Sequence, residues 1–347
     1  MLHETYMQRC LQLAKLGAGN VAPNPMVGAV LVHNDRIIGE GYHRQYGFAH
    51  AEVNCINNVS KENEYFLAQS TIYVSLEPCA HWGKTPPCAD LIIAKKIPRV
   101  VVGCRDPFEA VNGKGIEKLR AAGVEVTVNV AEEDCKKLNK RFFTFHTKYR
   151  PYIILKWVQT ADGKMASDKE KRLLISNEFT NRKVHHWRSE EASILAGTNT
   201  AMQDNPRLDN RLWSGKSPVR MVVDKELRLP QSLHLFDGSQ RTIVFNFLQQ
   251  SEEKNVLYQQ IKRENNLAAA ICAACYNLNI QSILVEGGAQ LLQTFIDAGL
   301  WDEARVITNQ SLYIGTGLSA PSLQQHQLLT SAEILFDKIQ YFICNSL

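Results

Sequence analysis

Four residues of this sequence have the types and spacing of a catalytic zinc centre. His50 and Glu52 stand two positions apart, and Cys79 and Cys88 follow at the two ends of the segment 79–88. One histidine and two thiolates make a three-ligand set that leaves the fourth zinc position open to water. Zinc lowers the pKa of such a water from about 15.7 toward about 7, so that hydroxide is available at neutral pH. Glu52 is too close to His50 in sequence to be a second ligand on the same helix face, so we predict that it carries the proton of that water.

Each of these residues also has a structural alternative. A single histidine on a helix is more often a structural residue than a ligand, and an isolated Cys79 or Cys88 is more often a buried thiol. A closed structural zinc site is a further possibility, but only His81 is available nearby as a fourth ligand. The joint pattern, His-x-Glu at the start of a helix and Pro-Cys after a strand, favours the catalytic interpretation that zinc deaminases exemplify.

The second half of the chain carries groups suited to phosphates. Arg188 and Arg211 can each present a guanidinium fork to a sugar phosphate, although a single arginine is usually only a surface residue. The run Glu286-Gly287-Gly288-Ala289 follows an apolar stretch and opens a helical pattern. Backbone N–H groups at such a helix start can bind a dinucleotide pyrophosphate. The run lacks the G-x-G-x-x-G fingerprint, which argues against a Rossmann NAD site, and a plain turn remains the alternative.

Hydrophobic periodicity predicts the elements that must position the first cluster. Helices are expected over residues 2–17, from about residue 50, over 89–95 and over 115–122. Strands are expected over residues 27–32, 37–42, 71–76, 99–104 and 124–128, with 71–76 and 99–104 buried and parallel. The basic segment 136–150 then follows, which we expect to be a solvated surface that joins two domains.

A second series of elements follows that segment. Strands are expected over residues 152–158, 192–196, 219–224, 242–245, 282–285 and 303–308. Helices are expected over residues 177–189, 254–264, 267–278 and 289–298. This alternation predicts an α/β architecture in both halves. The pair Cys272 and Cys275 shares one helix face and is expected in the core, as are Trp157 and Trp187, rather than in a redox or stacking site.

Length and composition limit the class of protein. At about 150 residues per domain, 347 residues indicate roughly two domains. An apolar fraction of 45% with 21% charged residues is typical of globular proteins and excludes disordered or collagen-like chains. A net charge of +4 is too mild for a nucleic-acid footprint. We expect no membrane span, because no apolar run is long enough, and no secretion signal. Nine cysteines, an odd number in a long chain, argue against a disulfide framework and for a reducing cytoplasm.

The insertion between Cys79 and Cys88 is the most specific feature of the sequence. Its run Ala-His-Trp-Gly-Lys-Thr-Pro-Pro, with the runs 22–28 and 41–43, resembles the RibD family of riboflavin-biosynthesis deaminase/reductases over nearly the whole chain. The resemblance implies a cytidine-deaminase-like three-layer domain over residues 1–146 and a dihydrofolate-reductase-like domain over 147–347. It also implies one zinc ion per chain, NADPH, and deamination of a diaminopyrimidinone ribose phosphate before its ribosyl chain is reduced to ribityl. The implied protein is a cytoplasmic homo-oligomer, a dimer or tetramer.

The resemblance also assigns roles to individual residues. For the deaminase half it implies zinc ligands His50, Cys79 and Cys88, the proton carrier Glu52, and substrate contacts from Asn24, His43, His81 and Lys84. For the reductase half it implies catalytic roles for Lys156 and Asp204, and substrate contacts from Arg172, Arg188, Leu208, Arg211 and Glu286. The implied NADPH residues are Val158, Leu174, Thr200, Asp204, Lys225, Gly288, Ala289, Gln290, Leu291, Leu292, Gln293 and Thr294. Leu174 departs from the family, in which tryptophan is common at that position.

Two other functions compete with this one. The first is a deaminase of nucleic acids whose second half is a binding module, but the mild charge and the lack of clustered stacking aromatics argue against it. The second is a non-catalytic interaction protein with a structural zinc, against which the complete His50, Glu52, Cys79 and Cys88 set argues.

Overall fold

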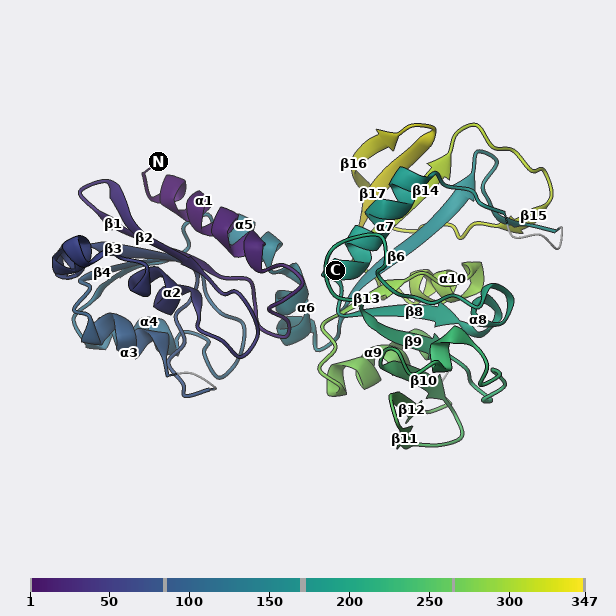
Figure 1. Cartoon of the computed structure of the whole chain (residues 1–347), viewed down its shortest axis with the longest axis horizontal. Coiled ribbons are helices and arrows are strands. Elements are labelled where there is room, and N and C mark those ends of the chain that lie inside the picture. Colours follow the sequence, from purple (N-terminus) through teal and green to yellow (C-terminus); the bar gives the residue numbers. More distant parts are fainter. Residues whose placement is uncertain (1, 84–85, 169–172, 264–265, 346–347) are drawn as a thin grey trace. The chain divides into compact units, whose positions relative to one another are not determined.

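A computed structural model describes residues 2–83, 86–168, 173–263 and 266–345, and Figure 1 shows its helices and strands. The contacts divide the chain into two compact units, residues 1–148 and 149–347. Lys84 and Arg172, both expected to contact substrate, lie outside the described residues. No helix in the described part of the chain is long and apolar enough to cross a membrane.

Unit 1 is built on a five-stranded sheet with the order β2-β1-β3-β4-β5. Strands β3, β4 and β5 are parallel, whereas β1 pairs antiparallel with β2 and β3. The strands are β1 (Gly28–His33), β2 (Arg36–Tyr42), β3 (Thr71–Leu76), β4 (Arg99–Cys104) and β5 (Glu125–Thr127). The helices are α1 (Leu2–Ala14), η1 (Lys15–Gly17), α2 (Ala51–Asn57), η2 (Lys61–Gln69), α3 (Cys88–Ala94), α4 (Lys114–Ala121), α5 (Glu132–Leu138) and α6 (Lys140–Lys148).

The sheet of unit 1 has an apolar core on each face, because side chains alternate along a strand. On β1, Ala29 and Leu31 pack with α2, α3 and α4, whereas Val30 and Val32 pack with α1 and α5. This arrangement confirms the predicted three-layer α/β/α domain. The basic segment 136–150 reaches the boundary between the two units, as expected of a joining segment, and most of it is the end of α5 and α6. It is not solvated throughout, because Phe142 and Phe145 of α6 are buried.

Unit 2 is built on a ten-stranded mixed sheet with the order β11-β12-β10-β9-β8-β13-β6-β14-β17-β16. Its strands are β6 (Tyr152–Thr160), β8 (Ser193–Gly197), β9 (Val219–Val223), β10 (Thr242–Asn246), β11 (Ser251–Glu253), β12 (Val256–Gln260), β13 (Ser282–Val285), β14 (Glu303–Asn309), β16 (His326–Ile334) and β17 (Asp337–Cys344). Two short strands, β7 (Lys164–Ser167) and β15 (Gly317–Ser319), pair separately. The helices are α7 (Glu178–Glu190), α8 (Thr198–Asp204), η3 (His234–Phe236), α9 (Leu267–Asn277) and α10 (Ala289–Asp297).

The core of unit 2 confirms several expectations and corrects one. Cys272, Cys275 and Trp157 are buried in the core cluster that also contains α10 residues, and Trp187 is buried on the other sheet face. The helix expected over residues 254–264 is wrong, because that stretch contains β12, which pairs parallel with β10 and antiparallel with β11. Residues 256–260 form a strand because β10 offers them backbone hydrogen bonds. The periodicity of the local sequence does not show this long-range pairing.

Candidate functional site

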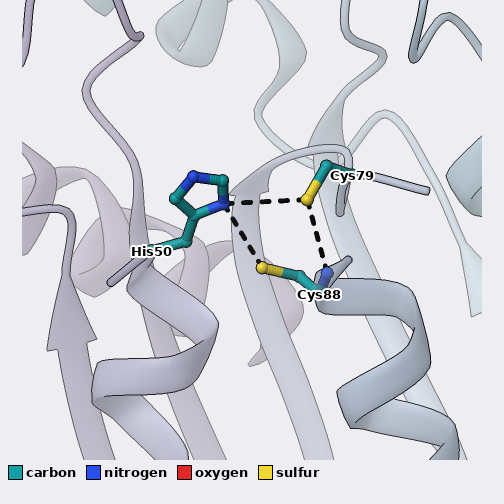
Figure 2. Close-up of side chains that lie close together, drawn as sticks. All are labelled: His50, Cys79 and Cys88. Atoms are coloured by element: carbon teal, nitrogen blue, oxygen red, sulfur yellow. Dashed lines mark hydrogen bonds between the residues drawn. The ribbon is translucent and has the colours of Figure 1, made fainter. Parts of the chain in front are cut away.

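The three expected zinc ligands lie together in unit 1, as Figure 2 shows. His50 is the N-cap of α2, Cys79 follows β3 in the loop, and Cys88 is the first residue of α3. His50 Nδ1 lies 3.4 Å from Cys88 Sγ and 3.7 Å from Cys79 Sγ, and all three ligand atoms lie within 4.8 Å of one another. In a tetrahedral zinc site the nitrogen and sulfur ligands are about 3.5 Å apart, given typical bond lengths. These residues therefore fit a zinc ion.

The charges of this cluster are coupled to one another. Hydrogen bonds from Cys88 and His50 lower the pKa of Cys79 to about 4, which favours the thiolate that binds zinc. The backbone N–H of Cys88 donates to Cys79 Sγ at 3.3 Å. Glu52 is 3% exposed, and burial raises its pKa to about 7, although the nearby His50 lowers it. Glu52 therefore lies against the ligands as a carboxyl group that can both accept and donate a proton.

Two other expected substrate residues lie next to the zinc ligands. Asn24 Nδ2 lies 3.2 Å from His43 Nε2, and the His43 ring meets the His50 ring edge-on at 5.3 Å. His43 Nδ1 lies 3.1 Å from the Ala49 carbonyl oxygen. Burial lowers the pKa of His43, which favours the neutral ring. Asn24 and His43 therefore offer hydrogen-bonding groups beside the metal ligands, as expected.

Sequence reasoning missed one residue that holds the zinc loop in place. Glu77 is 4% exposed and lies two positions before Cys79. Its carboxylate accepts the backbone N–H groups of Asp106 (3.3 Å), Gly113 (2.9 Å), Gly115 (3.0 Å) and Ile116 (3.2 Å). This binds the β4–α4 loop and the start of α4 to the strand end that carries Cys79. An acidic residue directly before Pro-Cys is the only signal of this role in the sequence.

In unit 2, three of the expected residues form one buried ionic cluster. Arg188 Nε donates to Glu286 Oε1 at 2.9 Å and Nη2 donates to Oε2 at 2.8 Å, while Lys156 Nζ lies 3.4 Å from Oε2. The three side chains are 13%, 7% and 11% exposed, in the order Arg188, Glu286 and Lys156. Burial alone would raise the pKa of Glu286, but the charges of Arg188 and Lys156 lower it to about 2. Burial lowers the pKa of Lys156.

Within this cluster Arg188 has partners on both Glu286 and Asp209. The bidentate edge of its guanidinium is occupied by Glu286, and Nη1 donates to the Asp209 carbonyl oxygen at 2.9 Å. The expected contact of Arg188 with the substrate stays a prediction, and within the chain its fork pairs with Glu286. The Arg211 side chain is more accessible: it is 54% exposed and pairs with Asp209, so it can reach a phosphate.

The turn that follows β13 lies beside the turn that follows β8, and each turn begins a helix. Strands β8 and β13 are parallel neighbours, and Gly197 and Gly288 are the N-caps of the helices that follow them. A Cβ placed on Gly288 would lie 3.2 Å from Thr200 Oγ1, and one placed on Gly287 would lie 3.4 Å from the Gly197 nitrogen. The starts of α8 and α10 thus lie next to each other, and because the first N–H groups of a helix have no partner within that helix, this arrangement suits a pyrophosphate.

The remaining expected residues of unit 2 differ in how accessible they are. Leu208, Leu291 and Leu292 are 4%, 8% and 0% exposed and pack in the core, so their side chains are not available to a ligand. By contrast, Leu174 is 78% exposed. Asp204, Lys225 and Gln290 are exposed, whereas Val158, Ala289, Gln293 and Thr294 are half-buried. Val158 lies two residues after Lys156 on β6, on the same face of the sheet.

Comparisons with known proteins cover both units. The model of the RibD C-terminal domain matches residues 151–343, and that of the cytidine and deoxycytidylate deaminase zinc-binding region matches residues 1–104. Riboflavin biosynthesis protein RibD of Aquifex aeolicus is 37% identical over 98% of this chain and 95% of its own length. RibD of Bacillus amyloliquefaciens is 36% identical over 93% of this chain and 88% of its own length.

Solved structures are similar over the full length. The crystal structure of a diaminohydroxyphosphoribosylaminopyrimidine deaminase/5-amino-6-(5-phosphoribosylamino)uracil reductase from Thermotoga maritima is 35% identical, with a TM-score of 0.87 and 99% coverage of both chains. Acinetobacter baumannii RibD is 28% identical, with a TM-score of 0.88 and coverage of 99% of this chain and 98% of that one. The similarity therefore includes both units.

Proposed function

Because the chain belongs to the RibD family of riboflavin-biosynthesis enzymes, we propose that its two units carry the two successive activities of that family. The protein is a bifunctional deaminase and reductase that uses zinc and NADPH. We assign the deaminase to residues 1–146 and the reductase to residues 147–347. The observation that carries the assignment is the convergence of His50, Cys79 and Cys88 on one point, with Glu52 buried against them.

In the deaminase, a diaminopyrimidinone ribose phosphate exchanges one exocyclic amine for oxygen, consuming water and releasing ammonia. Zinc held by the three ligands supplies the Lewis acidity that activates water. The Glu52 carboxylate takes a proton from that water and delivers it to the departing amine. Asn24 and His43 hydrogen-bond the edge of the pyrimidine, and their mutual contact fixes their orientation.

In the reductase, the ribosyl chain of the deaminated product becomes ribityl. NADPH supplies the reducing equivalents. Lys156 can donate a proton to the sugar as it is reduced, because burial makes its ammonium group more acidic. Glu286 and Arg188 position that ammonium group from the neighbouring strand β13 and from α7. The paired helix N-termini at Gly197 and Gly288 bind the cofactor phosphates, and Arg211 binds the sugar phosphate.

The proposal is tested by supplying the diaminopyrimidinone ribose phosphate to the full chain loaded with zinc. Without NADPH, mass spectrometry should show replacement of one amine by oxygen and nothing more. With NADPH, the same product should gain two hydrogen atoms. Unchanged substrate in both reactions would contradict the proposed function, and binding to single-stranded nucleic acid that weakens with salt would favour the nucleic-acid deaminase instead.

We also propose a reducing, cytoplasmic setting and self-association. No disulfide joins cysteines within the described residues, which fits a reducing compartment. The edge strand β16 is exposed along nearly its whole length and carries Leu328 and Leu329, 48% and 55% exposed. Because an apolar edge strand invites pairing, a second copy of the chain would fit there. Sedimentation analysis should therefore show a dimer or larger species, and a monomer at micromolar concentration would contradict this.

A further inference from the structure

The ring of Phe108, in the loop between β4 and α4, lies beside the ring of His81. The ring of Phe108 meets that of His81 edge-on, with centroids 6.0 Å apart and planes at 70°. His81 lies two residues after the ligand Cys79. Phe108 is 38% exposed, so part of this residue is accessible from outside the protein.

An aromatic side chain of α6 also contacts the Phe108 ring. The ring centroid of His146 lies 5.0 Å from that of Phe108, 4.5 Å from that of Phe142 and 5.3 Å from that of Phe145. Phe142 and Phe145 are buried, so this cluster of rings extends into the core of unit 1. Moving the Phe108 ring away from His81 would therefore disturb its packing against α6.

The backbone beneath the ring is fixed as well. The Phe108 N–H donates to Asp106 Oδ1 at 2.8 Å, and Asp106 is 6% exposed. The Asp106 N–H donates in turn to Glu77, the carboxylate that binds this loop to the strand end carrying Cys79. Phe108 and the metal ligand are thus connected through a short series of buried hydrogen bonds, which presets their relative positions.

The same place has an unused polar atom. His81 Nδ1 is buried and has no hydrogen-bond partner within the described part of the chain. A buried ring nitrogen without a partner in the protein can be satisfied by a water or by a bound ligand. Beside it, Phe108 offers an apolar surface, and a pyrimidine requires both kinds of contact: hydrogen bonds at its edge and packing on its ring.

We propose that Phe108 is a substrate-binding residue of the deaminase, whose ring packs against the pyrimidine while His81 Nδ1 hydrogen-bonds its edge. This inference rests on the proposed function of unit 1. An aromatic contact of about 1.4 kcal/mol corresponds to a tenfold change in binding. Phe108→Ala should therefore raise the KM for the diaminopyrimidinone ribose phosphate about tenfold and leave kcat within about twofold.

The test measures deaminase kcat and KM, zinc content and reduction of the deaminated substrate for the parent, Phe108→Ala, Phe108→Tyr and Tyr65→Ala. Tyr65 is the matched control, because it is a 79% exposed aromatic on η2. Phe108→Tyr and Tyr65→Ala should keep the parent KM within about twofold. Zinc content and the reductase step should be unchanged in every variant.

The outcomes separate this inference from the function on which it rests. A parent enzyme that fails to deaminate would contradict the proposed function itself. An active parent with an unchanged KM in Phe108→Ala would overturn the role of Phe108 alone. If Phe108→Ala loses zinc, the test uses Phe108→Leu, which keeps an apolar side chain against His146. A KM of Phe108→Leu near that of the parent would overturn the proposal. A raised KM with full zinc content would support it.

Discussion

Replacing Glu286 by glutamine should destabilise unit 2 strongly, because it leaves two buried cations without their counter-charge. The parent carboxylate accepts both nitrogens of the Arg188 fork and lies 3.4 Å from Lys156 Nζ. Its pKa is about 2 in the folded chain against an ordinary value of 4.5. At 1.36 kcal/mol per pKa unit, this difference corresponds to about 3 kcal/mol of folding free energy. Removal of one partner from a buried ion pair typically costs about 3–5 kcal/mol, which agrees.

The same shift predicts a pH dependence with a definite sign. The pKa of Glu286 is depressed by folding, so its stabilising contribution is complete above pH 4.5 and is lost as the pH falls toward 2. The difference between parent and Glu286→Gln should therefore be about 3 kcal/mol at pH 7 and about 1.4 kcal/mol at pH 3.

Urea unfolding monitored by tryptophan fluorescence is a suitable assay. Trp157 and Trp187 are buried in unit 2, whereas Trp82 of unit 1 is 75% exposed and should report little change. Glu252→Gln is the control, because the Glu252 carboxylate is 51% exposed. This substitution should change the free energy of unfolding by less than about 0.5 kcal/mol. Stability of Glu286→Gln within 0.5 kcal/mol of the parent at pH 7, or an equal difference at pH 3 and pH 7, would refute the reasoning.

Four further outcomes are expected. Glu52→Gln should keep zinc, measured by atomic absorption, but lose deamination, and activity near that of the parent would show that another group carries the proton. Chelation of zinc should stop deamination and spare reduction of the deaminated substrate; loss of both steps would argue against separate sites. Gly288→Val should weaken NADPH binding in a titration, and unaltered affinity would move the phosphates elsewhere. Gly115→Ala should unfold unit 1 or cost it zinc, since the new Cβ would lie 1.9 Å from the Pro78 carbonyl oxygen; a stable, zinc-loaded variant would contradict that packing.

Separability of the two activities follows from where their residues lie in the chain. A mixture of Glu52→Gln and Lys156→Met proteins should convert the starting substrate fully in the presence of NADPH, provided that the intermediate diffuses between molecules. Alone, Glu52→Gln should reduce only substrate that is already deaminated, and Lys156→Met should only deaminate the starting substrate. If both variants failed in both half-reactions, the two units would form one interdependent site and the assignment of one activity to each would be wrong.

The three proposed zinc ligands, which the structure brings together, could be picked out from the sequence because residue type and short spacing identify them. Cys79 and Cys88 stand at the two ends of one segment, and His50 caps the helix whose first turn carries Glu52. Parallel strands and the helices between them are likewise marked by continuous apolar runs, and the expected strands 71–76, 99–104 and 282–285 agree with β3, β4 and β13. Such features depend on neighbours in the chain, so one sequence contains them.

Contacts between distant segments could not be predicted in the same way. Lys156 and Glu286 are 130 positions apart, and only the pairing of β6 with β13 brings them together. The four N–H groups that Glu77 accepts and the contact between the Phe108 and His146 rings also join separate elements. Sequence composition and spacing thus determined which chemistry the chain carries. The order of strands in the sheets, set by long-range packing and backbone pairing, decided which charges and rings meet.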